Sequence, residues 1–253
     1  PSCLGMIWFH YRDQSLTGRG PGFGPDLVYG EHYAGAQFLT EVQGGSDVGA
    51  NAVAAGQRAD GSWRLDGEKW FCSVADAGLF VISARPEGAT DGTRGLALFL
   101  VPRMIDGEPN DFRLRRLKDK LGTRSMATGE IEFEGALAEP IGALDQGFKN
   151  LVSIVLDTSR VHNALAACGI MRRAYVESLA YAATRRAFGR EIVGFGAVRS
   201  TLARMRLRNV AALTTTFRIL EMTDRLETSG TAELEASRRI AVMINKYWTA
   251  LAA

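Results

Sequence analysis

The sequence Phe38-Leu39-Thr40-Glu41-Val42-Gln43-Gly44-Gly45-Ser46-Asp47 is the most informative stretch of the chain. An apolar run ends in the hydroxyl of Thr40, and two glycines are followed by the hydroxyl of Ser46. Glycines let a backbone approach a planar ligand without an intervening Cβ atom. The hydroxyls and the amides around them offer hydrogen bonds to a ring edge or a phosphate. A tight hairpin turn that binds nothing explains the same residues, because short glycine-rich motifs are common.

A second stretch, Asp66-Gly67-Glu68-Lys69-Trp70-Phe71-Cys72-Ser73, carries a large indole and a hydroxyl close together. A flavin needs an aromatic side chain against its apolar face and small polar groups at its ring nitrogens and carbonyls. Trp70 and Ser73 provide one of each. The competing interpretation makes Trp70 an ordinary core aromatic of a β-domain.

Residues 36–145 have the pattern of an antiparallel β-barrel or sandwich. Short apolar runs alternate with the turn pairs Asp60-Gly61, Asp66-Gly67, Asp91-Gly92 and Asp106-Gly107, which are typical of antiparallel strands joined by tight turns. The predicted strands are residues 53–58, 63–65, 69–73, 79–84, 95–101, 112–117 and 128–133.

Residues 146–253 are predicted to form an antiparallel helical bundle, so that the fold class is α+β. Positions 148–188 contain no proline and one glycine, and their apolar residues recur at helical spacing. A second helix is predicted over 198–225, and Thr231 is expected to cap a third helix with Glu233 and Glu235 in its first turn. The expected buried side of the first helix is Leu151, Ile154, Val155, Val161, Leu165, Met171, Tyr175, Leu179 and Ala182. Its expected exposed residues are Arg172, Arg173 and Glu177.

Both ends of the sequence indicate a segment of a longer polypeptide. Residues 1–35 include a glycine- and proline-rich run at 17–25, which predicts a connecting arm. The chain opens with Pro1 and stops at Leu251-Ala252-Ala253, inside an apolar helical pattern and without a capping residue. We therefore expect the helical bundle to be incomplete.

Composition indicates a globular protein, with 46% hydrophobic and 23% charged residues. The net charge of +2 does not, by itself, indicate a protein that binds nucleic acid. No apolar run reaches the roughly 18 residues of a membrane span. The cysteines and histidines lack the spacing of a disulfide framework or a metal site, so we predict no metal and a reducing cytoplasm. They are Cys3, Cys72, Cys168, His10, His32 and His162.

A third stretch, residues 118–133 (KDKLGTRSMATGEIEF), makes the pattern specific. In this order and spacing, the three stretches resemble the middle domain of the acyl-CoA dehydrogenase family, and Arg185-Arg186-Ala187-Phe188-Gly189 resembles its Arg-x-x-Phe-Gly signature. Thr-Glu-x-Gln-Gly-Gly-Ser-Asp-Val, Lys-Trp-Phe-x-Ser and Arg-Leu-Lys-Asp-Lys-Leu-Gly-x-Arg-Ser match its AidB-like branch. The resemblance covers about residues 36–250.

The resemblance implies FAD as the cofactor, with residues 37–46 and 70–73 around the isoalloxazine ring and ribityl chain. Arg185 would contact the FAD pyrophosphate of a partner subunit, where a guanidinium can pair with phosphate, although a solvated arginine is the simpler alternative. Ser46 and Arg160 would meet the acyl thioester, and for Arg160 the alternative is a structural ion pair. The implied cofactor contacts are Gln37, Phe38, Leu39, Thr40, Gly45, Ser46, Trp70, Phe71, Cys72, Ser73, Arg185 and Phe188.

Three departures from the family's pattern concern catalysis and assembly. The family's catalytic glutamate lies in a late loop beyond Ala253 or immediately before the helix arginine, where Ser159 stands here, and a serine hydroxyl cannot remove a proton from carbon. No catalytic base is therefore identified. A glutamine that usually follows the Phe-Gly signature is replaced near Gly196, and the family's N-terminal helical domain is missing from this sequence.

Three functions compete on the sequence alone. The first is an acyl-CoA dehydrogenase that removes the α proton of an acyl-CoA thioester, passes the β hydrogen to flavin N5 and delivers electrons to an electron-transfer flavoprotein. The second is an AidB-like flavoprotein that binds DNA in alkylation defence, and the third is a cofactor-free assembly module. The family's helices pack into tetramers, so a homotetramer is expected. The basic residues considered for DNA are Arg113, Arg115, Arg116, Lys118, Lys120, Arg199, Arg204, Arg206 and Arg208.

Overall fold

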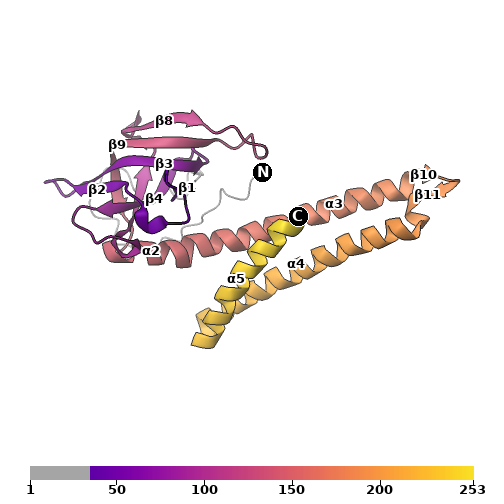
Figure 1. The fold of residues 1–253 in the computed structure, drawn as a ribbon. Helices are drawn as coiled ribbons and strands as arrows, with labels where there is room; N and C mark the ends of the chain where they lie inside the picture. Colours follow the sequence, from indigo (N-terminus) through magenta and orange to yellow (C-terminus); the bar gives the residue numbers. More distant parts are fainter. Residues whose placement is uncertain (1–34) are drawn as a thin grey trace. The chain divides into compact units, whose positions relative to one another are not determined.

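A computed structural model describes residues 35–253 of the chain (Figure 1). The chain divides into two compact units, the first reaching Val155 and the second spanning Leu156–Ala253. The sequence pattern instead changes at 145/146. The arm predicted over 1–35 lies outside the described residues except for Gly35, the first residue of strand β1, and Cys3, His10 and His32 also lie outside them.

The first unit is built on a seven-stranded sheet whose strand order is β1-β4-β2-β3-β9-β5, with β8 paired to β9. Because β4 also pairs with β5, the sheet closes on itself like a barrel. A separate small ladder joins β6 to β7. The strands are β1 (Gly35–Phe38), β2 (Ala54–Gln57), β3 (Trp63–Ser73), β4 (Leu79–Pro86), β5 (Ala97–Pro102), β6 (Met104–Ile105), β7 (Glu108–Pro109), β8 (Phe112–Leu117) and β9 (Thr128–Pro140).

The α+β class predicted from the sequence is confirmed, and the β-domain is more mixed than an antiparallel barrel. β1 and β2 both run parallel to β4, whereas the pairs β2–β3, β3–β9, β4–β5 and β8–β9 are antiparallel. β4 lies between β1 and β2 in the sheet, and the stretch of chain that connects β1 to β2 is the loop that carries the double glycine.

The turn predicted at Asp66-Gly67 is wrong, because β3 continues through it as one strand, Trp63–Ser73. The ladder with β9 shifts register between Leu65 and Asp66, and Gly67 has a φ of 128°. A glycine in this conformation is typical of a bulge, where the strand bends without ending. At Asp60-Gly61 the chain does turn, with the Gly61 amide bonded to the Arg58 carbonyl at 2.9 Å.

The core of the first unit fills the inside of the closed sheet. Phe38 and Phe80 pack there with ring centroids 4.7 Å apart, and Phe99 and Phe133 are almost completely buried. The side chain of Cys72 belongs to the same cluster. Burial raises the pKa of the Cys72 thiol to about 12, so the thiol stays protonated at neutral pH.

Helical structure begins at α2 (Gly147–Asn150), continues as a π-helical segment (Leu151–Leu156) and runs on into α3 (Asp157–Thr184). The continuous helical region predicted over 148–188 is thus confirmed as far as Thr184. A two-residue turn, Phe188-Gly189, then joins β10 (Arg186–Ala187) to β11 (Arg190–Glu191). Both turn residues have positive φ, as the type I′ turn of such hairpins requires.

The second unit pairs α3 with α4 (Gly196–Ser229), and α5 (Ala232–Ala252) packs against both (Figure 1). The predicted cap is confirmed: Thr231 Oγ1 accepts the Leu234 amide at 3.2 Å, and Glu233 and Glu235 lie in the first turn. An ion pair of 2.6 Å joins Arg238 on α5 to Asp157 on α3. The ion pair links the first turns of α5 to the start of α3.

The predicted buried side of the first helix is right only in part. Leu151, Val155, Val161, Met171 and Ala182 are buried, but Ile154 is 58% exposed and Leu165 and Leu179 are each 37% exposed. A helix buries only the strip on which its neighbours lie, and within residues 35–253 no neighbour covers these three side chains completely. Arg172, Arg173 and Glu177 are exposed as predicted. No helix of the described part of the chain is long and apolar enough to span a membrane.

The close approach of α2 to β5 gives a first prediction. A Cβ atom at Gly147 would lie 2.4 Å from Ala97 Cα and 2.5 Å from the Leu96 carbonyl oxygen. We expect Gly147→Ala to lower the free energy of unfolding by about 1–3 kcal/mol, because overpacking against backbone cannot be relieved by a rotamer change. Thermal and urea denaturation measure the loss. Gly122→Ala is the matched control, since a Cβ there meets nothing within 4 Å; equal stability of the two variants would contradict the packing.

The buried Cys72 gives a second prediction. With its pKa at about 12, on the order of one thiol in ten thousand is ionised at pH 8, and only the thiolate attacks an alkylating reagent. Iodoacetamide at pH 8 should leave Cys72 unmodified in the folded protein and alkylate it quickly after denaturation. Peptide mapping by mass spectrometry follows this one residue. Alkylation at the same rate in both states would show that Cys72 is not in the core.

Candidate functional site

The two stretches singled out in the sequence lie side by side in the structure. The Trp70 amide donates a hydrogen bond of 2.8 Å to the Thr40 carbonyl, although the residues are thirty positions apart. Thr40 follows shortly after β1, and Trp70 lies within β3. The residue whose hydroxyl is predicted to meet the ligand and the residue whose indole is predicted to cover it are therefore held together through their main chains.

The double glycine forms a tight turn beside Thr40. The Gly44 amide donates to the Glu41 carbonyl at 2.9 Å, and Gly44 has a φ of 105°, which a glycine adopts without strain. A Cβ atom at Gly45 would lie 3.0 Å from Thr40 Oγ1. Gly45 and Ser46 are exposed, whereas Thr40 is half-buried. The turn thus places an accessible main chain and the Ser46 hydroxyl near the Thr40 side chain.

A fully buried ion pair lies beneath this loop. Lys69 Nζ is 2.8 Å from Glu41 Oε1, and the two side chains are 0% and 5% exposed. The same ammonium donates to the Leu39 carbonyl and to Ser83 Oγ, both at 3.2 Å. Burial lowers the pKa of Lys69, and Glu41 opposes that effect. Neither sequence motif indicates this pair.

One face of the Trp70 indole carries a cation. Lys118 Nζ lies 3.3 Å from the ring centroid and is also 2.5 Å from Glu130 Oε1. Glu130 is buried and accepts from Arg116 as well, at 2.7 Å. Burial acts to raise the pKa of Glu130, but the hydrogen bonds from Lys118 and Arg116 outweigh it and hold that pKa below its usual value. A cation over an indole stabilises both groups.

Ser73 takes part in a small hydroxyl network at the end of β3. Its Oγ is 3.1 Å from Thr128 Oγ1, and Lys120 Nζ donates to the same threonine oxygen at 3.0 Å. A hydroxyl has one proton and two lone pairs, so Ser73 Oγ, which is bonded to Thr128, retains capacity for up to two further partners. Thr128 and Lys120 lie in the third stretch of the sequence motif, residues 118–133, but neither was predicted as a contact of the site.

Several predicted contacts could reach a ligand only through the main chain. The side chains of Phe38 and Cys72 lie in the core. The Leu39 carbonyl already accepts from Asn51 Nδ2 at 2.7 Å and from Lys69. The side chains of Gln37 and Phe71, by contrast, are not in the core. Gln37 is half-buried in β1, and Phe71 is 54% exposed next to Trp70.

The remaining predicted residues belong to the second unit. Arg185 follows the end of α3 and is exposed, with its amide bonded to the Tyr181 carbonyl at 2.9 Å. Phe188 is 97% exposed at the tip of the β10–β11 turn and has a φ of 51°. Arg160 is half-buried on α3 beside Ser159, and within residues 35–253 no ion pair involves it. The structural ion pair considered for Arg160 is therefore absent from this part of the chain.

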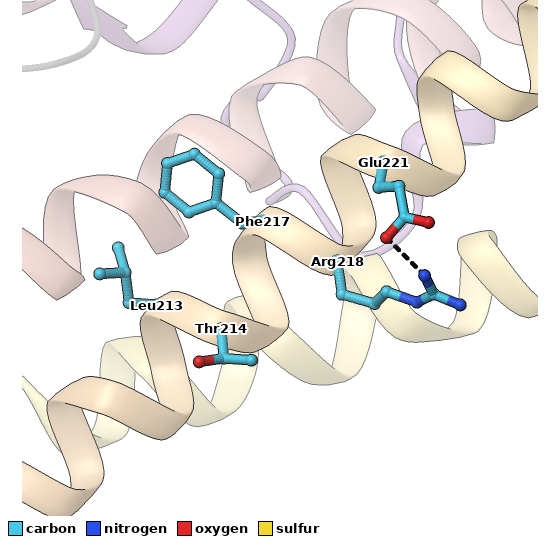
Figure 2. A pocket seen from close by; sticks show the side chains of 5 residues that line it. All are labelled: Leu213, Thr214, Phe217, Arg218 and Glu221. Carbon is cyan, nitrogen blue, oxygen red and sulfur yellow. Dashed lines mark hydrogen bonds and ion pairs between the residues drawn. The ribbon is translucent and has the colours of Figure 1, made fainter.

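A hollow on the surface of α4 is lined by none of the predicted site residues. It is lined by Leu213, Thr214, Phe217, Arg218 and Glu221, which follow one another along a single helix (Figure 2). Arg218 and Glu221 form an ion pair across its edge. One helix face with one internal ion pair offers a ligand little enclosure.

The basic residues of β8 are neutralised by their neighbours. Arg113 pairs with Glu132 at 2.6 Å and Arg115 with Glu68 at 2.7 Å, while Arg116 and Lys118 share the buried Glu130. These cross-strand pairs use the charges to hold the sheet together. This strand therefore presents no uncompensated positive surface.

Two regions of the chain match domains of one protein family. Residues 36–136 match "Acyl-CoA dehydrogenase, middle domain", and residues 145–253 match "Acyl-CoA dehydrogenase, C-terminal domain". The two matches divide the chain almost where the strand pattern gives way to the helical one. Between them they contain every predicted site residue.

Individual relatives agree with these matches. The chain is 38% identical to AidB of Escherichia coli (strain K12), a match that covers 74% of this chain and 34% of the relative. It is 33% identical to "Acyl-CoA dehydrogenase family member 11" of Caenorhabditis elegans, over 81% of this chain and 34% of the relative.

Among solved structures, Caenorhabditis elegans ACDH-11 in complex with C11-CoA superposes with a TM-score of 0.80 and 32% identity, over 86% of this chain and 38% of that one. The chain thus spans about a third of the length of these relatives. From the two domain matches and these relatives, we conclude that the chain belongs to the acyl-CoA dehydrogenase family.

Proposed function

We propose that this chain contributes the isoalloxazine-binding part of an FAD site in an acyl-CoA dehydrogenase. The observation that carries the proposal is the hydrogen bond between the Trp70 amide and the Thr40 carbonyl. It joins an indole, an adjacent hydroxyl and a glycine turn into one surface of the first unit. The family to which the chain belongs supports the same assignment.

The residues present suit a flavin. Thr40 and Ser46 have no hydrogen-bonding partner for their hydroxyls within the described residues, so both can bond to ring nitrogens or carbonyl oxygens. Gly45 has no Cβ, and the space where one would lie is bounded by Thr40 Oγ1, so the main chain can approach a planar ring closely. Trp70 is half-buried and offers an aromatic surface. FAD bound here would supply the acceptor for a hydride from the β carbon of an acyl-CoA thioester.

Residues of the second unit extend the proposal to the other end of the cofactor. Arg185 is exposed and has no ion-pair partner in the described part of the chain, so its guanidinium is available for a pyrophosphate. We propose that it meets the FAD of a second copy of the chain, with Phe188 beside it, in a homotetramer. Both residues lie at the exposed end of the α3–α4 pair.

Arg160 and Ser46 are proposed to contact the acyl-CoA substrate. Removal of the α proton needs a base, and Ser159 cannot serve because a serine hydroxyl is far too weak a base for a carbon acid. We therefore assign no residue of this chain to that step. An electron-transfer flavoprotein is the proposed acceptor of the electrons.

The cofactor proposal is tested on the full-length protein expressed with ample riboflavin. We expect a yellow protein whose FAD absorption is bleached anaerobically by at least one member of a panel of acyl-CoAs. Thr40→Val should weaken FAD binding by about tenfold, the equivalent of one lost hydrogen bond of about 1.4 kcal/mol. Thr90→Val is the control, because Thr90 lies in the loop between β4 and β5. A protein that stays colourless after reconstitution with FAD would refute the proposal.

DNA binding is a second candidate function, and one feature of the second unit favours it. Residues 170–210 contain nine arginines, two glutamates and no lysine or aspartate. Only Arg173 and Arg186 pair with those glutamates. α3 and α4 lie side by side here, so the remaining arginines concentrate positive charge on one end of the pair. Such a concentration attracts a polyanion such as duplex DNA.

A salt titration of DNA affinity tests this candidate. Replacing Arg199, Arg204 and Arg208 by glutamine should weaken binding and lower the slope of log affinity against log salt concentration by about 0.9 for each phosphate that the variant no longer neutralises. The matched control replaces Arg113, Arg115 and Arg116, which are ion-paired on β8, and should leave the slope unchanged. Affinity that does not respond to salt, or equal reductions in both triple variants, would count against DNA binding.

A further inference from the structure

The polar network beneath the glycine turn has no evident purpose in folding alone. Lys69 is completely buried in β3, and its ammonium has three acceptors: Glu41 Oε1, Ser83 Oγ and the Leu39 carbonyl. Lysine is almost never fully buried unless it is paired. A buried ion pair often adds little stability, because desolvation offsets the attraction between the charges. Its geometry therefore needs another explanation.

Glu41 connects this lysine to the strand that follows the loop. Its Oε2 accepts the Ala52 amide at 2.6 Å, and its Oε1 accepts the Val53 amide at 3.2 Å as well as the Lys69 ammonium. Asn51 adds a parallel link, since its Nδ2 donates to the Leu39 carbonyl at 2.7 Å and its Oδ1 accepts from Gln43 Nε2 at 3.0 Å. Both ends of the loop are thus tied together from the buried side.

Thr40 lies between the anchored groups. The carbonyl before it is held by Lys69, the side chain after it is held by Lys69 and two amides, and its own carbonyl accepts from Trp70. Its hydroxyl has no partner among the described residues. The network therefore fixes the backbone of Thr40 while leaving its side chain available.

We propose that Glu41 and Lys69 are positioning residues that set the Thr40 hydroxyl against the Trp70 indole for the flavin. They act through the loop and touch neither the cofactor nor the substrate. The inference rests on the proposed FAD site and adds to it the residues that determine its geometry. A pair that served only to stabilise the sheet would affect FAD binding no more than any other loss of stability does.

The test replaces both charges in the full-length protein with the double variant Glu41→Gln and Lys69→Met. The amide oxygen of Gln still accepts from Ala52 or Val53, and Met fills the space of Lys69 without a charge. We expect the folded variant to bind FAD about tenfold or more weakly, with altered fine structure in the flavin absorption bands. In the absence of FAD, hydrogen exchange at the Gly44 amide should become faster, since its bond to the Glu41 carbonyl loosens.

Gly147→Ala is the control, because it weakens the same unit by overpacking α2 against β5 and leaves the loop intact. It should keep the parental FAD affinity and spectrum at a comparable loss of melting temperature. If the double variant does not fold, Glu41→Asp is tested instead. Its shorter side chain cannot reach Lys69 and both amides together, so we expect this variant to bind FAD more weakly.

Each outcome bears on a distinct claim. A yellow parent with a double variant of unchanged affinity, spectrum and exchange would overturn the positioning role and leave the FAD site standing. Equal reductions of FAD binding in Gly147→Ala and in the double variant would also overturn it, because general stability would then explain both. A parent that never binds FAD would remove the proposed function and this inference with it.

Discussion

The antiparallel pairing of β3 with β9 is the contact on which the first unit depends. It runs from Trp63 opposite Ala138 to Ser73 opposite Thr128, and β2 and β8 are added at its two sides. Leu65 and Ile131 project from it into the core, while Trp70 and Ser73 belong to the candidate site. A slip of one residue would exchange the two faces. The same ladder therefore secures both the hydrophobic core and the geometry of the ligand surface.

Sequence patterns predicted the fold class and most elements, and their errors have local causes. The strand predicted at 112–117 agrees with β8, because apolar and basic residues there are bounded by clear turn residues. The turn predicted at Asp66-Gly67 was wrong because β-bulges and turns favour the same residue types. Only the pairing of β3 with β9 shows that the strand continues through these two residues. The predicted burial of Leu165 and Leu179 was wrong because helical spacing identifies an apolar stripe of a helix, whereas the burial of each side chain depends on which helices lie against that stripe.

The candidate site was predictable where one motif carries the chemistry and not where distant residues combine. Thr40, Ser46 and Trp70 stood out by residue type, and the structure brings Thr40 and Trp70 into contact. Glu41 and Lys69 were given no role from the sequence, because nothing in either motif indicates that they meet in the interior. The basic residues on β8 are the opposite case. They form a positive run in the sequence, but they pair with acidic residues on other strands.

The ammonium of Lys118 has a consequence for the electrostatics above Trp70. Lys118 and Arg116 share the single buried carboxylate of Glu130, so only one of these two positive charges is neutralised by it. The potential of the remaining charge falls only as the inverse distance. A group in contact with the indole therefore experiences a positive local potential.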